Sequence, residues 1–127
     1  MELNDITENI IGAAIEVHRT LGAGLLESIY EECLCYELAS RGISFDKQYA
    51  VSLLYKKVAL NASYKIDLFV EEAVVVELKT VEKILPIHEA QILTYMKLVE
   101  SSVGLLINFN VPYLRQGIKR KVLNFKE

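Results

Sequence analysis

Two periodicities of hydrophobic residues divide the chain into eight predicted elements. Apolar residues three and four positions apart predict helices over about residues 4–20, 26–40 and 86–99, the last starting at Pro86. Runs of β-branched and aromatic residues predict strands over residues 45–55, 58–70, 74–79, 103–110 and 118–125. The order α-α-β-β-β-α-β-β predicts an α/β fold (α+β, with a mixed sheet) in which helices pack against the sheet.

The same spacing predicts which helix positions are buried. The expected buried stripes are Leu26, Ile29, Cys33, Leu34 and Leu38 in the second helix, and Ile87, Ala90, Leu93 and Leu98 in the third. The last strand alternates apolar residues with lysine and arginine, which predicts an edge strand protected by its charges.

The hairpin over residues 64–79 contains the polar positions of most interest. A turn centred on Glu72 would place Asp67 opposite Glu77 and Lys65 opposite Lys79, with all four on one face. The other face would be an apolar core face made of Ile66, Leu68, Val70, Val74, Val76 and Leu78. Two facing carboxylates repel each other unless something positive lies between them. A divalent cation, Lys79, or both would meet that need.

Composition limits the class of protein. The chain has 127 residues, of which 52% are hydrophobic and 24% charged, so we expect one ordered domain over residues 1–127. It has no apolar run long enough for a membrane span and no signal-peptide pattern at its start, so we expect a cytoplasmic protein without membrane contact. Cys33 and Cys35 lie two apart on a predicted helix, which favours reduced thiols.

The net charge of −3 argues against a general nucleic-acid coat protein, but it allows a local basic rim. An ordinary solvated surface is the alternative for such a rim, and the acidic net charge favours that alternative for most of its members. The candidates are Lys56, Lys57, Lys65, Arg115, Lys119, Arg120 and Lys121.

An acidic residue on one strand and Glu-x-Lys on the next suits metal-dependent phosphodiester cleavage. Carboxylate oxygens of Asp67 and Glu77 can hold Mg²⁺, which lowers the pKa of a bound water. Lys79 can orient that water or neutralise the transition state. The alternative is a solvated, salt-bridged strand face. Zinc or thiol chemistry is a weaker alternative, because the cysteines and histidines have no ligand spacing.

Polar residues on two helices extend this set. His88, Gln91 and Tyr95 share one stripe of the third helix. Gln91 can hold a water or phosphate oxygen and Tyr95 can donate a hydrogen bond, although Tyr95 as a half-buried packing residue is the alternative. For His88 a solvent-facing position is favoured. Glu27 lies in the first turn of the second helix, where a carboxylate also suits the helix dipole, and Tyr30 is favoured as a core residue.

These motifs together resemble the GxxExxY protein family, which is placed in the PD-(D/E)XK nuclease superfamily. The resemblance extends from about Ile6 to Val122, and its motifs are Gly24–Tyr30, Tyr64–Asp67, Val76–Lys79 and His88–Tyr95. It implies a restriction-endonuclease-like αβββαβ core, with an extra N-terminal helix and a C-terminal edge strand. It also implies Asp67, Glu77 and Lys79 as the superfamily triad, and Glu27 as an additional acidic member. Gln91 and Tyr95 match the QxxxY element of the exonuclease-like branch.

Two hypotheses follow. In the first, the protein is a Mg²⁺-dependent (or Mn²⁺-dependent) nuclease acting on DNA. Its ligands are Asp67, Glu77 and Glu27, its transition-state stabiliser is Lys79, and Gln91 and Tyr95 position water or phosphate. In the second, the chain is a non-catalytic interaction or regulatory module that keeps the nuclease fold. A homodimer or a protein partner fits either hypothesis, because the chain has no room for a separate DNA-reading domain.

Overall fold

The computed structural model describes residues 1–124, apart from the side chains of residues 61–63. Its elements follow the predicted order α-α-β-β-β-α-β-β, with one short 3₁₀ helix before the last strand. The last strand was expected to reach Phe125 but ends at Val122, and residues 125–127 lie outside the description. The elements are α1 (Leu3–Leu21), α2 (Glu27–Ser40), β1 (Phe45–Tyr55), β2 (Val58–Val70), β3 (Val74–Lys79), α3 (Pro86–Leu98), β4 (Val103–Asn108), η1 (Leu114–Gly117) and β5 (Ile118–Val122).

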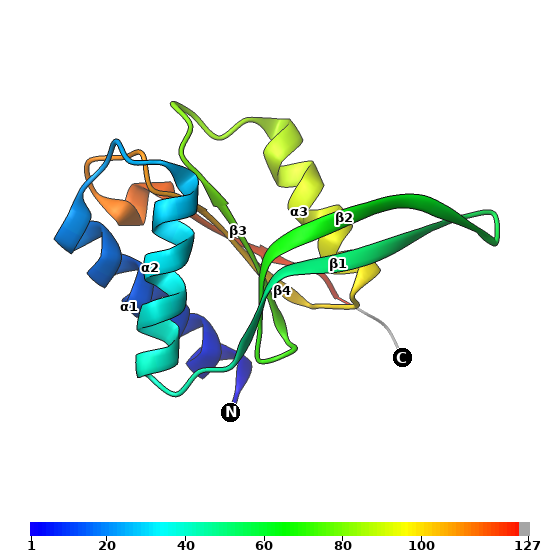
Figure 1. The fold of residues 1–127 in the computed structure, drawn as a ribbon, viewed down its shortest axis with the longest axis horizontal. Helices are drawn as coiled ribbons and strands as arrows, with labels where there is room; N and C mark the ends of the chain where they lie inside the picture. Colours follow the sequence, from blue (N-terminus) through cyan, green and yellow to red (C-terminus); the bar gives the residue numbers. More distant parts are fainter. Residues whose placement is uncertain (125–127) are drawn as a thin grey trace.

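A five-stranded mixed sheet in the order β1-β2-β3-β4-β5 forms the middle of three layers. Helices α1 and α2 cover one face and α3 covers the other (Figure 1). Strands β3 and β4 are parallel, with α3 as their crossover, and the other neighbouring strands are antiparallel. Because both faces are covered, β3 and β4 are buried over almost their whole length. No helix in the described part of the chain has the length and apolar character needed to cross a bilayer.

The central hairpin has the predicted turn but a shorter register than predicted. Strands β2 and β3 pair only from Leu68–Val76 to Val70–Val74. The expectation that Lys65 faces Lys79 is therefore wrong, because β2 leaves β3 before that point and Lys65 pairs with Ala50 of β1.

Strand β2 twists as it leaves the sheet, and this changes which face its side chains cover. Leu68 and Val70 pack beneath α1 and α2, as predicted. Ile66 was expected on that same face but packs with α3 instead, in a cluster with Phe69 and Val75. Strong twist is usual in two-stranded segments.

Two predicted helix stripes were displaced around the helix axis. In α2 the buried side chains are Tyr30, Leu34 and Leu38, whereas Leu26 and Ile29 are exposed. In α3 they are Ile92, Tyr95 and Met96, so the expectation of Ile87 and Ala90 in the core is wrong. The buried residues in each helix are themselves three or four apart, and they include tyrosines that the apolar pattern had not counted.

Tyr30 connects the core to the loop that leads into α2. Its ring stacks on Phe109 with 4.4 Å between ring centroids. Its hydroxyl donates to the carbonyl of Gly22 at 2.5 Å and accepts from the backbone N–H of Leu25 at 3.2 Å. These bonds hold the loop between α1 and α2, and therefore set where Glu27 begins α2.

We expect Tyr30→Phe to destabilise the protein by about 1–2 kcal/mol, because it leaves two partly buried backbone groups without their partner. Urea unfolding monitored by circular dichroism measures this. Tyr36→Phe is the matched control, since Tyr36 lies on the same helix but is 71% exposed. Equal stability of the two variants would contradict the proposed role of the hydroxyl.

Candidate active site

The point where β2 separates from β3 is occupied by a carboxylate. One residue beyond the last β2–β3 pair, Asp67 Oδ2 accepts a hydrogen bond from the backbone N–H of Leu78 at 2.8 Å. The side chain thus takes over the role of the next strand partner. This contact places the Asp67 carboxylate beside Glu77, as the predicted facing pair required.

Glu77 is a buried acid in the middle of the sheet. It is only 4% exposed, and its Oε1 atom has no hydrogen-bond partner among the described residues. Burial, followed by the neighbouring Asp67 carboxylate, raises the pKa of Glu77 to about 10, and the charge of Lys79 only partly opposes this. Without a further cation, Glu77 therefore holds a proton at neutral pH.

Glu27 approaches the pair from the first turn of α2. Burial, and then the negative charge of Asp67, raise its pKa, while Lys79 lowers it. A favourable interaction with the helix dipole alone therefore does not explain the position of Glu27, because its carboxylate lies close enough to Asp67 and Lys79 to feel their charges. The structure brings Glu27 to the same site as the two strand acids.

Gln48 links Asp67 to Glu31 by hydrogen bonds. Gln48 lies on β1 between Lys47 and Tyr49, which pair with Leu68 and Ile66, and has a left-handed backbone conformation with φ of 50°. Its Nε2 atom donates to Glu31 Oε1 at 2.6 Å and to Asp67 Oδ1 at 3.2 Å. Each Asp67 oxygen thus accepts a hydrogen bond from an uncharged donor, Oδ1 from Gln48 and Oδ2 from the Leu78 N–H. These bonds orient the carboxylate without neutralising its charge.

The end of β3 is fixed by the neighbouring strand. Lys79 pairs with Asn108 of β4, and its carbonyl accepts from the Phe109 N–H at 2.9 Å. The Asn108 side chain is buried and bonds both backbone groups of Val81, at 3.1 Å and 2.8 Å. These bonds fix the chain as it leaves β3, and Lys79 remains half-buried at the site.

Helix α3 closes the site from the other face of the sheet. Tyr95 is 6% exposed, and burial followed by the charges of Glu77 and Asp67 raises its pKa. It packs in the α3 core, and its ring lies 5.9 Å from that of Tyr64. Gln91, one turn earlier, is half-buried. His88 accepts from the Leu85 N–H through Nδ1 at 3.0 Å and so caps the start of α3.

The donor set fits a divalent cation of the magnesium class. Asp67 and Glu77 supply oxygen ligands, and the unpartnered Glu77 oxygen is an acceptor that a cation would satisfy. In the described part of the chain, no three His, Cys, Asp or Glu side chains form a ready-made metal cluster, so Glu27 does not complete one with the pair. Magnesium commonly uses one or two carboxylates and keeps several waters, which suits this pair.

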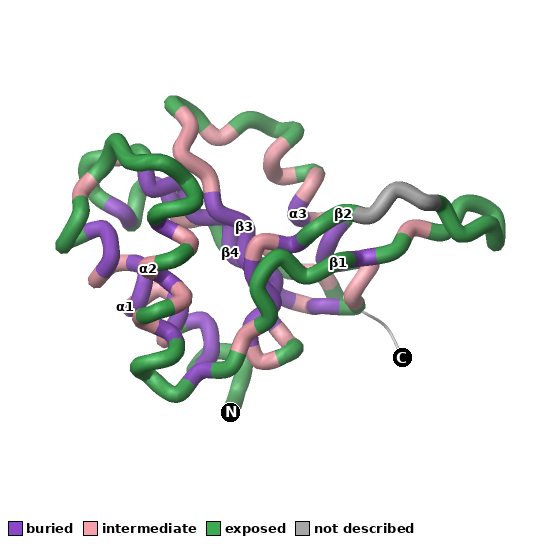
Figure 2. The backbone as a smooth tube through the Cα atoms, in the orientation of Figure 1, coloured by how far each residue is buried: buried purple, intermediate pink, exposed green. Residues whose placement is uncertain are grey.

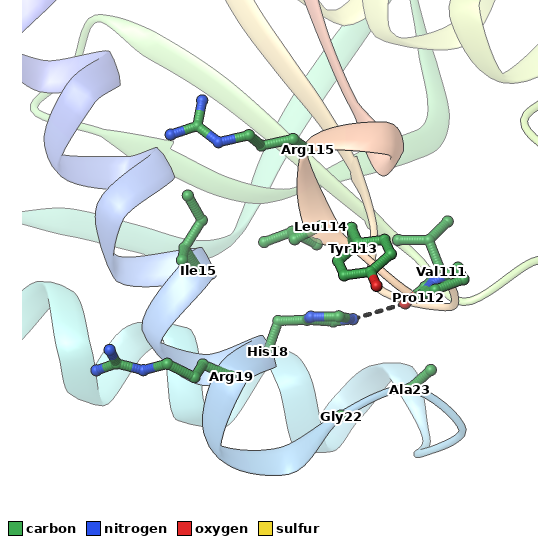
Figure 3. Close-up of a pocket in the computed structure, with 10 residues that line it drawn as sticks. All are labelled: Ile15, His18, Arg19, Gly22, Ala23, Val111, Pro112, Tyr113, Leu114 and Arg115. Atoms are coloured by element: carbon green, nitrogen blue, oxygen red, sulfur yellow. Dashed lines mark hydrogen bonds between the residues drawn. The ribbon is translucent and has the colours of Figure 1, made fainter.

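A separate cavity of about 480 Å³ lies on the other side of the Gly22–Leu25 loop, between the end of α1 and η1 (Figure 3). None of the predicted site residues lines it. His18 forms part of its wall, with Nε2 2.8 Å from the Val111 carbonyl oxygen, and Arg19 and Arg115 extend at its edges (Figure 3).

Sequence reasoning missed three contributors to the site. Glu31 lies one helical turn after Glu27, and this spacing was a usable signal. Gln48 had none, because its role depends on a left-handed residue in a strand that reads as regular. Tyr64 was noticed only as part of a motif, although its ring contacts Tyr95.

Comparison with known proteins gives one match. A model of the PD-(D/E)XK nuclease superfamily matches residues 4–121. No curated protein and no solved structure matches the chain. The order α2-β1-β2-β3-α3-β4 is the αβββαβ core expected of a restriction-endonuclease-like fold, with α1 before it and β5 after it.

We expect Glu77→Gln to stabilise the metal-free protein at neutral pH. The folded state holds a proton on Glu77 up to a pKa of about 10, whereas the unfolded state releases it near 4.5. The contribution of Glu77 to the free energy of unfolding of the wild type is therefore most favourable below pH 4.5 and declines as pH rises toward 10. The variant has no such loss, so its advantage in Tm should grow from pH 5 to pH 9, reaching at least about 3 °C.

Thermal unfolding in EDTA at several pH values measures this difference. Glu72→Gln is the control, because Glu72 is exposed in the turn of the same hairpin and should leave the pH profile unchanged. A variant less stable than the wild type at pH 8 would show that Glu77 is ionised and compensated in the metal-free protein.

Proposed function

Because the chain belongs to the PD-(D/E)XK nuclease superfamily, we propose that it is a Mg²⁺- or Mn²⁺-dependent nuclease that hydrolyses phosphodiester bonds in DNA. The observation that carries the proposal is the buried, unpartnered carboxylate of Glu77 beside Asp67. A purely structural site has no use for an acid in a sheet interior, where an apolar residue would be more stable. A cation explains why it is there.

Asp67 and Glu77 would hold the metal, with Glu27 as an accessory ligand or as the base. When bound, the metal supplies a water of lowered pKa and positive charge beside the phosphate. Asp67 is oriented for this by Gln48 and by the Leu78 N–H. Glu77 must lose its proton to bind a cation, so metal affinity should rise with pH.

The remaining residues act on the substrate. Lys79 carries positive charge beside the two acids and would neutralise the charge that develops on the phosphate. The Tyr95 hydroxyl stays protonated at neutral pH, since its pKa is raised, and is a hydrogen-bond donor for a phosphate oxygen or water. Gln91, one turn away on the same helix face, would position the same group.

Finer assignments are also part of the proposal. The spacing from Gly24 through Glu27 to Tyr30 supports membership of the GxxExxY family, and the Gln91–Tyr95 spacing supports the exonuclease-like branch. We propose action in the cytoplasm as one domain. We also propose a homodimer or a protein partner, which would add substrate contacts to those of this chain.

We expect the wild type to cleave labelled DNA only with Mg²⁺ or Mn²⁺. Glu77→Ala and Lys79→Ala should each lower the rate at least about 100-fold, because the first removes a metal ligand and the second removes the positive charge that would neutralise the reacting phosphate. Gel analysis of labelled single-stranded and duplex DNA measures the rate. Mononucleotide products would indicate an exonuclease, and internal fragments an endonuclease.

Matched controls are Glu72→Ala and Lys97→Ala, which remove exposed charges of the same sign elsewhere. Metal titration of the melting temperature gives a second readout, since a cation that binds only the folded state raises Tm. If the wild type neither cleaves nor gains stability with metal, the nuclease proposal is wrong and the site belongs to a non-catalytic module.

A further inference from the structure

The hairpin of β1 and β2 continues past the sheet as a free two-stranded arm, residues 52–63 (Figure 1). Its root is the pair Val51–Tyr64, where Val51 is the last buried residue. Beyond it, none of the arm's described side chains is buried (Figure 2). From Val51 to Tyr55 the strand extends by roughly 13 Å at the usual rise per residue. The arm thus projects without a core to stabilise it.

The arm has a charge opposite to that of the rest of the protein. Residues 52–63 contain two lysines and no acidic residue, in a chain whose net charge is −3. Lys56 and Lys57 lie at the tip, Lys65 lies near the root, and Lys47, also near the root, pairs with Glu31 at 3.9 Å. A projecting positive element on an acidic protein suits a polyanionic partner.

Apart from Arg115, which lies at the cavity between the end of α1 and η1, the basic residues expected to form a rim separate into two groups. Lys119 and Lys121 pair with Glu89, and Arg120 donates to Thr7 and Asn4. Lys56, Lys57 and Lys65 take part in no ion pair within the described residues, so their charges are available to a ligand.

The tip has lysines where the backbone favours other residues. Lys56 and Lys57 have φ of 48° and 71°, so both central residues of the turn are left-handed. Such turns strongly prefer Asn-Gly, because ordinary side chains are strained there. Two consecutive lysines are therefore kept at a conformational cost, which indicates that their charge has a use outside the hairpin.

Apolar side chains accompany the lysines on the arm. Tyr55 and Val58 stand directly opposite each other, and Leu60 lies two residues further along the same strand. They are 61%, 58% and 40% exposed. A projecting rod with apolar and cationic side chains is convex, so it fits a concave surface lined by phosphates.

We propose that this arm inserts into the major groove of duplex DNA and holds the duplex beside the Asp67–Glu77 site. The major groove of B-form DNA admits a two-stranded β-ribbon, whereas the major groove of duplex RNA is too deep and narrow for side chains to read. A single strand has no groove to receive a convex element and is usually bound in a channel with stacking platforms. The inference rests on the proposed function for the role of the site, but DNA binding by the arm does not require cleavage.

The root of the arm connects it to the site. Tyr64 contacts Tyr95, whose pKa responds to Glu77 and Asp67. Ile66 packs with α3, and Asp67 follows directly in the chain. A duplex gripped by the arm is therefore held next to the acidic pair.

The test removes the tip charges without weakening the turn. The double variant Lys56→Asn plus Lys57→Gly has the residues that this turn prefers, so its hairpin should fold at least as well. Binding of a fluorescent 20-base-pair DNA is measured by anisotropy in EDTA at several salt concentrations. We expect about tenfold weaker binding than wild type, with the slope of log K against log salt smaller by about 1.8, as for two lost phosphate contacts.

Two controls accompany it. Lys56→Arg plus Lys57→Arg keeps the charge and should retain wild-type affinity and slope. Arg19→Gln plus Arg115→Gln removes two charges at the other end of the molecule (Figures 1 and 3) and should leave the slope nearly unchanged. Single-stranded DNA and duplex RNA of the same length should bind more weakly than duplex DNA and respond less to the Asn-Gly variant.

Several results would overturn the arm proposal: wild type that does not bind duplex DNA, an Asn-Gly variant that binds as wild type does, or equal losses on single strands. A change of oligomeric state in that variant by analytical ultracentrifugation, with DNA affinity unchanged, would assign the arm to a protein interface instead. If the wild type cleaves DNA but the Asn-Gly variant binds duplex DNA as tightly as wild type does, the nuclease proposal stands and the arm proposal is wrong. If the Asn-Gly variant binds more weakly but the wild type does not cleave, the arm proposal stands and the nuclease proposal is wrong.

Discussion

A negative charge in the interior of the sheet is the constraint on which the site depends. Glu77 lies on β3 beside Leu106 of β4, helices cover both faces of the sheet, and the residue is only 4% exposed, so water has little access to its carboxylate. The nearest charged acid, Asp67, makes ionisation harder, and Lys79 only partly opposes it. The metal-free protein meets this constraint by keeping Glu77 protonated. A divalent cation would meet it differently, by making the ionised form the stable one.

The separation of β2 from β3 determines how the site is arranged. Strand β2 pairs with β3 over only three residue pairs and then departs with β1. The departure exposes a backbone N–H on β3, which Asp67 satisfies with its side chain. Beyond that point Glu27 of α2 and Tyr95 of α3 each lie close enough to the acids for their pKa values to respond to Asp67.

The same divergence explains which parts of the structure could be predicted. The turn at residues 71–73 and the alternation of Leu68, Val70, Val74 and Val76 determine the local register, so the proximity of the Asp67 and Glu77 side chains follows from sequence, although the strand pairing ends one residue before them. The twist of β2 does not, and for that reason Ile66 and Lys65 were misplaced. Gln48 escaped notice because its left-handed backbone and its two acidic partners exist only after three elements assemble.

Net charge was a misleading guide to the protein's partners. A value of −3 is an average over the chain and does not show where the acidic and basic residues lie. The acids Glu27, Asp67 and Glu77 gather at the site, where a cation would neutralise them before a phosphate approaches. Lys56 and Lys57, which form no ion pair within the described residues, lie at the tip of an arm that contributes nothing to the core. An acidic centre that binds metal and a basic arm that binds phosphates are compatible. The acids repel a phosphate only while the metal is absent, because a bound cation neutralises their charge.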